Sequence, residues 1–188
     1  MRNPCLLIID LQNDFLDHWP EADVDRLIAN TNSLIDHFRR AALPVIWVRL
    51  EFERDLSDAF LEMKEKSVSV TIRGTRGAEL HSKLDRRSHD HDIVKKRYSA
   101  FFNTGLDDLL ASLKTDEIVI CGINTHACIR TAAIDAYQRD FKVVLPSECI
   151  GSYDDEHAQV SLRYMDGKIA SVTTIAAIAA RLPWAHNR

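Results

Sequence analysis

The segment IVICGINTHACIRTAAIDAYQR, residues 118–139, decides the fold because its pattern changes partway along. Residues 118–121 form a continuous apolar run, which is typical of a strand that is buried on both faces of a parallel sheet. A short polar stretch follows Gly122, and residues 127–139 then carry small side chains on one side at helical spacing, as suits a helix that packs closely on a sheet. The segment therefore predicts a strand, a turn and a helix.

The same alternation of short apolar runs with helical patterns continues toward both ends of the chain. The predicted strands are residues 5–9, 45–48, 93–94, 118–121, 143–145 and 169–172. The predicted helices are residues 24–38, 78–84, 106–113, 127–139, 154–165 and 175–182. This alternation predicts an α/β fold, a doubly wound three-layer α/β/α sandwich with a central, mostly parallel, six-stranded sheet. We expect one domain over residues 1–188, with a charged, irregular stretch at residues 51–75.

The composition excludes several classes of function. The chain has 188 residues, of which 46% are hydrophobic and 28% charged, and its net charge is -4 with basic and acidic residues interspersed. It has no basic stripe of the kind that binds nucleic acid, and residues 175–182 are too short an apolar run for a membrane span. The first apolar run ends at Asp10 and is too short for a secretory signal. We therefore expect a cytoplasmic protein, with its four cysteines as reduced thiols.

Three polar side chains follow predicted strands at the point where each strand ends. Asp10 comes directly after residues 5–9, and Lys95 comes after residues 93–94. Cys128 stands near the start of the helix that follows residues 118–121. Ligands of open parallel sheets bind beyond the carboxyl ends of the strands. We therefore expect these three side chains to lie close together.

This set of side chains suits acyl transfer. A helix N-terminus and a nearby ammonium group such as that of Lys95 both favour the thiolate form of Cys128, and Asp10 can accept the thiol proton. Backbone N–H groups at a strand-to-helix turn have no partner within the helix, so each can stabilise an oxyanion by about 3–4 kcal/mol. Taken singly, each residue also has a structural interpretation, as a packing cysteine, a turn aspartate or a solvated lysine.

Two groups of residues contain side chains that can bind metal ions, but neither group has the pattern of a metal site. Residues 89–92 read HDHD, but neighbours on an extended segment point to opposite faces, and we interpret the stretch as a solvated loop. Cys121, His126 and Cys128 lack a C-x-x-C pair and a fourth ligand. We therefore expect neither a bound metal nor another cofactor.

Three stretches of the chain resemble the motifs of one known family. They are IDLQNDF at residues 9–15, KKRYSAF at residues 95–101 and GINTHACIRTAA at residues 122–133. In this order, over residues 4–175, the chain resembles the isochorismatase-like cysteine hydrolases, which include nicotinamidases, N-carbamoylsarcosine amidases and ureidoacrylate amidohydrolases. The resemblance implies a hydrolase with a cysteine nucleophile and a small-molecule substrate.

The resemblance also implies roles for individual residues. Asp10, Lys95 and Cys128 would form the catalytic triad, and the N–H groups of Asn124 and Cys128 the oxyanion hole. A cis peptide bond would join Ile123 to Asn124. The match selects Lys95 over the lysine that follows it, and adjacent strand residues do point to opposite faces. By analogy with the family we expect a homodimer or homotetramer.

Two departures from known members bear on the substrate. Nicotinamidases carry an Asp-x-His metal motif after the second strand, whereas residues 48–53 here read VRLEFE, which disfavours both a metal and nicotinamide. True isochorismatases, which cleave a vinyl ether, lack the cysteine that is present here as Cys128. The sequence therefore favours cleavage of a C–N bond in a small amide, carbamoyl or ureide substrate through a thioester.

Three alternatives remain open at this point. They are vinyl-ether hydrolysis of the isochorismatase type, a redox-active thiol, which no C-x-x-C motif supports, and a non-catalytic binding or scaffold subunit. The candidate substrate-binding residues are Phe15, Phe101, Thr125 and Tyr153. For the aromatic ones, plain packing is an equal interpretation.

Overall fold

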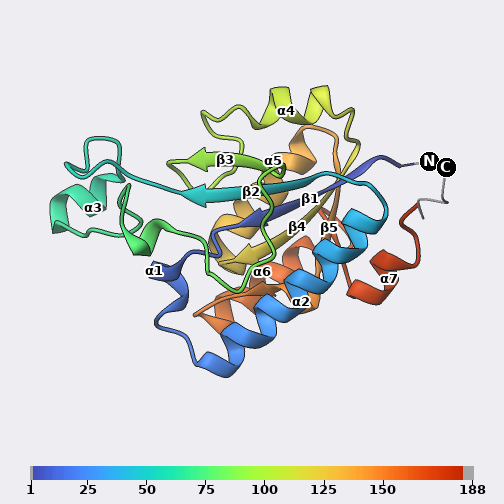
Figure 1. The fold of residues 1–188 in the computed structure, drawn as a ribbon, viewed down its shortest axis with the longest axis horizontal. Coiled ribbons are helices and arrows are strands. Elements are labelled where there is room, and N and C mark those ends of the chain that lie inside the picture. Colours follow the sequence, from blue (N-terminus) through green and yellow to red (C-terminus); the bar gives the residue numbers. More distant parts are fainter. Residues whose placement is uncertain (1, 184–188) are drawn as a thin grey trace.

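Seven strands form one sheet in the computed structural model, which describes residues 2–183. They are β1 (Pro4–Ile9), β2 (Val45–Leu50), β3 (His91–Lys95), β4 (Glu117–Ile123), β5 (Lys142–Pro146), β6 (Ile150–Gly151) and β7 (Ser171–Thr173). Six strands lie in the order β3-β2-β1-β4-β5-β7, and β6 pairs with the end of β4. Every pairing between these strands is parallel, so their carboxyl ends meet at one edge of the sheet (Figure 1).

Helices cover both faces of the sheet (Figure 1). On one face, the packed helices are α2 (Glu21–Arg40) and α7 (Ile175–Ala179). On the other face, they are α4 (Leu106–Ser112), α5 (Arg130–Gln138) and α6 (Asp155–Met165). The predicted three-layer α/β/α sandwich with a parallel sheet is confirmed.

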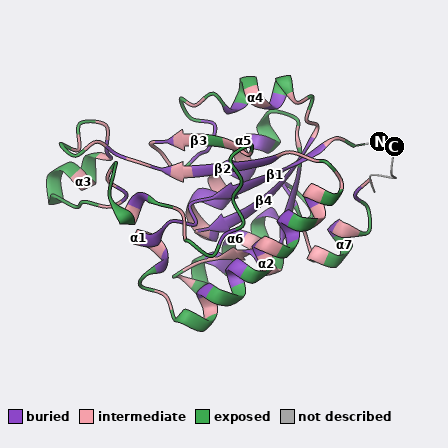
Figure 2. Ribbon diagram, in the orientation of Figure 1, coloured by how far each residue is buried: buried purple, intermediate pink, exposed green. Residues whose placement is uncertain are grey.

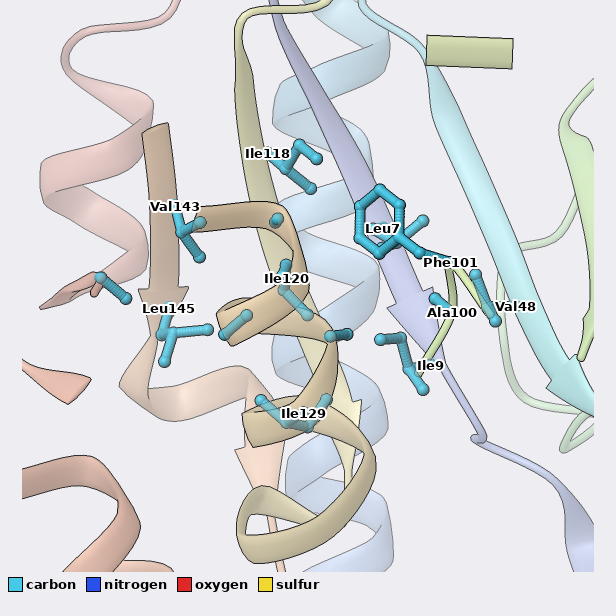
Figure 3. Packing of buried hydrophobic residues seen from close by; sticks show 14 of the residues in the cluster. Leu7, Ile9, Val48, Ala100, Phe101, Ile118, Ile120, Ile129, Val143 and Leu145 are labelled. Atoms are coloured by element: carbon cyan, nitrogen blue, oxygen red, sulfur yellow. The ribbon is translucent and has the colours of Figure 1, made fainter. Parts of the chain in front are cut away.

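The central strands are buried along their whole length, as their uninterrupted apolar sequences predict. All six residues of β1 and all seven of β4 are buried, and Figure 2 shows this purple centre between helices whose outer faces are green. In the layer under α5, Leu7 and Ile9 of β1 belong to one cluster with Ile118, Ile120 and Ile129 (Figure 3). The two layers together hold the carboxyl ends of β1 and β4 side by side.

The predicted helix at residues 78–84 is wrong. A short 3-10 turn, Arg76–Ala78, is followed by an irregular segment on the α2 side of the sheet. The backbone of Leu80 bridges that of Gln12, and the N–H of His81 donates to the carbonyl of Leu11 at 2.9 Å. Leu80 and Leu84 pack into the apolar layer on that face. Their helix-like spacing therefore reflects an irregular segment that is fixed to the turn after β1.

The HDHD stretch is only partly a solvated loop. His89 is exposed, but the Asp90 side chain is buried. Its Oδ2 atom accepts hydrogen bonds from the Trp47 indole and from Arg39, each at 2.9 Å. Asp90 therefore fixes the segment that precedes β3, and the prediction of a solvated loop is wrong for this residue.

Some elements lie outside the predicted ones. They are α1 (Asn13–Leu16), α3 (Leu61–Lys66) and the two-residue β6, which is too short to show a period. The helix predicted over residues 127–139 is α5 preceded by a π-helical turn, Thr125–Ile129. Within residues 2–183, no helix is both long enough and apolar enough to cross a membrane.

Candidate active site

The carboxyl edge of the sheet brings the three candidate catalytic side chains together. Asp10 follows β1, Lys95 ends β3 and Cys128 lies in the π-helical turn after β4. The Nζ atom of Lys95 is 2.8 Å from Oδ2 of Asp10 and 3.4 Å from Sγ of Cys128. Lys95 is 0% exposed and Cys128 is 7% exposed, so the cluster is almost closed to bulk water.

The Lys95 ammonium group has three polar neighbours, of which Asp10 is an ion-pair partner. Besides Asp10 and Cys128, it contacts the backbone carbonyl of Arg97 at 3.1 Å. An ammonium group has three donors and no acceptor, so the sulfur atom of Cys128 is an acceptor in this contact. The proton of the thiol can therefore pass to another acceptor. The Asp10 carboxylate is the candidate acceptor in this cluster.

The backbone around Asp10 turns sharply as it leaves β1. Asp10 has a φ of 57°, in the left-handed region, and its N–H donates to the carbonyl of Val48 at 2.9 Å. On the neighbouring strand, Gly122 has a φ of 114°, and a Cβ atom there would lie 2.0 Å from the carbonyl oxygen of Ile9. Only glycine allows this close approach. The short distance between Asp10 and the turn that carries Cys128 therefore depends on Gly122.

Gln12 fixes the end of β2 relative to the turn after β1. Its buried side chain accepts a hydrogen bond from the N–H of Leu50 at 2.8 Å and donates to the carbonyls of Leu50 and Ala78, both at 2.7 Å. The sequence assigns no role to this residue. The only signal for it is an amide two positions after Asp10 within the IDLQNDF stretch.

The turn that carries the thiol, Thr125–Ile129, has a hydrogen-bond pattern different from that of an α-helix. The carbonyl of Asn124 accepts from the N–H groups of Ala127 at 3.0 Å and Ile129 at 3.1 Å. In an α-helix this carbonyl would bond the N–H of Cys128, four residues on. The Cys128 N–H therefore does not bond this carbonyl. Turns of the π-helical type are frequent at functional sites. The peptide bond that leads into the turn, Ile123–Asn124, is cis.

Burial dominates the electrostatics of the cluster. It raises the pKa of the Cys128 thiol, and the negative charge of Asp10 raises it further, against the opposing effect of Lys95. For Lys95, burial lowers the pKa, but Asp10 and Cys128 raise it by more, so the net shift is upward. Both shifts favour a protonated ammonium group and a neutral thiol. The thiolate that the helix N-terminus and the ammonium group were expected to favour is outweighed by desolvation.

The four candidate substrate-binding residues lie in different surroundings. Tyr153 is 73% exposed and its ring is perpendicular to that of His126. Thr125 is buried in the turn that carries Cys128. Phe101 is buried in the apolar layer of Figure 3, and Phe15 is half-buried where two apolar clusters meet. Of these four residues, only Thr125 lies in the turn after β4 that carries the thiol, and only Tyr153 lies in the neighbouring loop after β6.

Two hydrogen bonds near the cluster were not predicted. The hydroxyl of Ser99 donates to the carboxylate of Asp135, which joins the loop after β3 to α5. The Nδ1 atom of His126 is 2.6 Å from Oγ of Ser152, which joins the turn that carries Cys128 to the loop after β6. Ser99 and His126 lie inside the motif stretches, but the sequence does not show their distant partners.

The acidic residues after β2 are paired with arginine rather than arranged around a metal. Arg73 is 2.9 Å from Glu51 and 2.6 Å from Glu53, and Arg49 also contacts Glu51. Because guanidinium groups are the partners of these carboxylates, this set of residues does not fit a metal ion. In the part of the chain that the structure describes, no group of three or more His, Cys, Asp or Glu side chains is placed to hold one.

Known proteins of similar sequence and structure cover almost the whole chain. The family model described as isochorismatase domain matches residues 4–177. A protein of Arabidopsis thaliana named probable inactive nicotinamidase is 35% identical over 148 residues, which cover 74% of this chain and 76% of that protein. An uncharacterized isochorismatase family protein of Bacillus subtilis is 28% identical over 90% of this chain and 92% of its own. The crystal structure of an isochorismatase family protein from Desulfovibrio vulgaris has a TM-score of 0.86 and 26% identity, and the match covers 96% of this chain and 98% of that one.

Proposed function

The chain belongs to the isochorismatase domain family, and on this premise we propose that it is a cysteine hydrolase that cleaves a C–N bond of a small amide, carbamoyl or ureide substrate. Cys128 is the nucleophile, Asp10 the acid and base, and Lys95 the cation that balances their charges. One observation carries the proposal. The Lys95 ammonium group lies 2.8 Å from the Asp10 carboxylate and 3.4 Å from the Cys128 sulfur, in a buried cluster at the edge where parallel sheets bind ligands.

The first step forms a C–S bond. The thiol proton of Cys128 passes to Asp10 as the sulfur attacks the carbonyl carbon of the substrate, and the C=O π electrons move onto oxygen. The raised pKa of the thiol supports a coupled transfer rather than a preformed thiolate, because burial and the Asp10 charge oppose a resting anion on sulfur. The N–H groups of Asn124 and Cys128 donate to the new oxyanion.

The second step breaks the C–N bond. As the tetrahedral intermediate collapses, Asp10 returns the proton to the departing nitrogen, and an amine or ammonia leaves a thioester on Cys128. Water then attacks the thioester carbon while Asp10 accepts a water proton. The C–S bond breaks, the acid product leaves and the sulfur is reprotonated. Lys95 keeps its proton throughout, as its raised pKa favours.

Further proposals concern the surroundings of the site. We propose a small-molecule substrate that is held near Thr125 and Tyr153, because Thr125 lies in the turn that carries Cys128 and the Tyr153 ring packs on His126 of the same turn. The cysteines are free thiols, which supports a cytoplasmic location, where thiols stay reduced.

We propose a homodimer or homotetramer by analogy with the family. Light scattering of the purified protein measures the oligomeric state directly.

Intact mass spectrometry tests the mechanism. The protein and its Cys128→Ala variant are incubated briefly with a panel of small amides, carbamoyl compounds, ureides and a chorismate-like vinyl ether. We expect an acyl adduct on the unmodified protein alone, together with release of amine or ammonia. Turnover of the ether without an adduct would instead establish isochorismatase-type chemistry. No adduct and no turnover with any compound of the panel would favour a scaffold role.

A further inference from the structure

The outer side of α6 carries large apolar side chains that remain exposed. Eight such side chains are exposed within residues 2–183, and three of them, Tyr153, Val160 and Tyr164, lie on α6 or directly before its N-cap. Val160 and Tyr164 are four residues apart, so they share one side of the helix, and each is nearly half exposed. The opposite side of α6 is buried in the apolar layer over the sheet. We call the exposed side, with Tyr153, Glu156, Val160 and Tyr164, the α6 face.

The C-terminal end of the α6 face is basic. The guanidinium group of Arg130 lies over the Tyr164 ring at 5.3 Å, and the ammonium group of Lys168 lies over it at 5.4 Å. The acid at this end, Asp166, accepts the backbone N–H of Val172 at 3.0 Å. Most arginines in the described part of the chain contact a carboxylate, for example Arg39, Arg49, Arg73 and Arg139, whereas Arg130 and Arg163 contact none there. Positive charge at this end therefore lacks a carboxylate partner within the described subunit.

The N-terminal end of the same helix is acidic. Asp154 caps the helix, and Asp155 and Glu156 stand in its first turn. The Asp154 carboxylate accepts the N–H of His157 at 2.9 Å and lies 2.8 Å from the imidazole of that residue. Asp155 and Glu156 have no basic partner among residues 2–183 and are exposed. Acids at the start and bases at the end also suit the helix dipole, and they give the two ends of the α6 face opposite charge.

The two ends of the α6 face complement each other about its middle. The helix spans Asp155–Met165, so Val160 is its central residue. When two copies of the helix run antiparallel with their Val160 side chains in contact, Glu156 of one lies opposite Tyr164 of the partner subunit, because each is four residues from the centre. The Glu156 carboxylate then meets the Arg130 and Lys168 cations that lie over that tyrosine. A two-fold axis makes every such contact twice.

We propose that the α6 face is the contact surface between two copies of this chain, which pair antiparallel about Val160. The inference rests on the proposed homo-oligomer and gives it a surface. Exposed tyrosine and arginine side chains around an apolar centre are the composition that is enriched in the cores of protein interfaces. The helix also packs on the turn Thr125–Ile129, so the contact lies one helix away from the turn that carries Cys128.

An aspartate at the centre of the face tests the contact. In Val160→Asp, two carboxylates meet at the two-fold axis, and we expect the Kd of the dimer in sedimentation equilibrium to rise about a hundredfold or more. A tetramer should dissociate to dimers, because its other interface is separate. The matched control is Leu61→Asp on α3, which lies beyond the carboxyl edge of the sheet (Figure 1) and is 70% exposed at this residue. It should leave the Kd unchanged, and circular dichroism shows that both variants remain folded.

A charge exchange tests the antiparallel pairing. Glu156→Lys places a cation against the basic end of the partner, and we expect the Kd to rise about tenfold. When Lys168→Glu is added, both charges of the contact are reversed, so most of the lost affinity should return. Glu65→Lys on α3 changes the net charge by the same amount at an exposed position and should leave the Kd unchanged.

The outcomes separate the surface from the oligomer. If the unmodified protein is a monomer at every concentration measured, the proposed oligomer and the inference both fail, and the proposed chemistry is unaffected. If the protein associates but Val160→Asp has no more effect than Leu61→Asp, the inference is wrong while the oligomer stands. A loss of affinity in Glu156→Lys that Lys168→Glu does not reverse would contradict the antiparallel pairing.

Discussion

A carboxylate is buried at each edge of the sheet, and the two are paired in different ways. Glu117, at the start of β4, is 0% exposed and contacts Lys142 at 3.5 Å and Arg181 at 2.5 Å, whose side chains remain 44% and 35% exposed. Asp10, at the opposite edge, contacts Lys95, which is 0% exposed. The partners of Glu117 therefore stay partly hydrated, whereas both charges of the Asp10 pair are removed from water.

The difference distinguishes a structural ion pair from the pair that we propose to be reactive. Burying two charges costs hydration energy that their mutual attraction only partly offsets, so the pair of Asp10 and Lys95 is a poor means of stabilising a fold. Its ammonium group also contacts the sulfur of Cys128. Glu117 joins β4 to β5 and to the segment after α7. Perturbed groups in such a cluster are typical of catalytic sites.

The largest expected effect is on turnover. Asp10→Asn removes the group that accepts and returns the proton in the proposed mechanism, so we expect kcat to fall roughly a hundredfold to ten-thousandfold. Glu117→Gln, the matched change at the other edge, should leave kcat almost unchanged and lower the free energy of unfolding by about 1–3 kcal/mol. Steady-state kinetics on the panel compound that gives the acyl adduct measures both. A similar loss of kcat in the two variants would show that Asp10 acts through stability alone.

The second effect is on stability. Lys95→Met leaves the Asp10 carboxylate buried without its cation, and we expect a loss of about 3–5 kcal/mol in the free energy of unfolding. Lys142→Met removes a half-exposed partner of Glu117 and should cost about 1 kcal/mol or less. Urea unfolding at neutral pH compares them.

A double variant shows whether the loss comes from the unpaired charge. When Asp10→Asn is added to Lys95→Met, the buried carboxylate is gone and part of the stability should return, because the two sites share one interaction. If the two losses are simply additive, the pair does not interact as the 2.8 Å contact indicates.

How far the sequence predicts the molecule depends on the range of the interactions involved. The apolar runs at residues 5–9 and 118–121 predict β1 and β4, because burial on both faces leaves a continuous local pattern. The irregular segment at residues 78–84 is held by Gln12 and Leu11, far away in the sequence, so its spacing alone predicts a helix that does not exist. The three strand ends predict that Asp10, Lys95 and Cys128 meet. The neutral state of the thiol depends on burial in the folded protein, which no local pattern shows.

The smallest expected effect is on the titration of the thiol, and it has a definite sign. The negative charge of Asp10 raises the pKa of Cys128 and the positive charge of Lys95 lowers it. Asp10→Asn should therefore let the thiolate form at a lower pH, and Lys95→Met should move its formation to higher pH. The thiolate absorbance in the ultraviolet is followed against pH, and the curve of the same protein with Cys128→Ala is subtracted.

Glu117→Gln serves as the control in this titration and should leave the curve in place. The Asp10→Asn result is the informative one, because the variant should ionise its thiol more readily and yet turn over far less. That combination would show that the site depends on a proton transfer to Asp10 during attack. If the thiol pKa shifts in the same direction in Asp10→Asn and Lys95→Met, repacking and not charge sets it. The charge of Asp10 would then have no more effect on the thiol than the charge of Glu117.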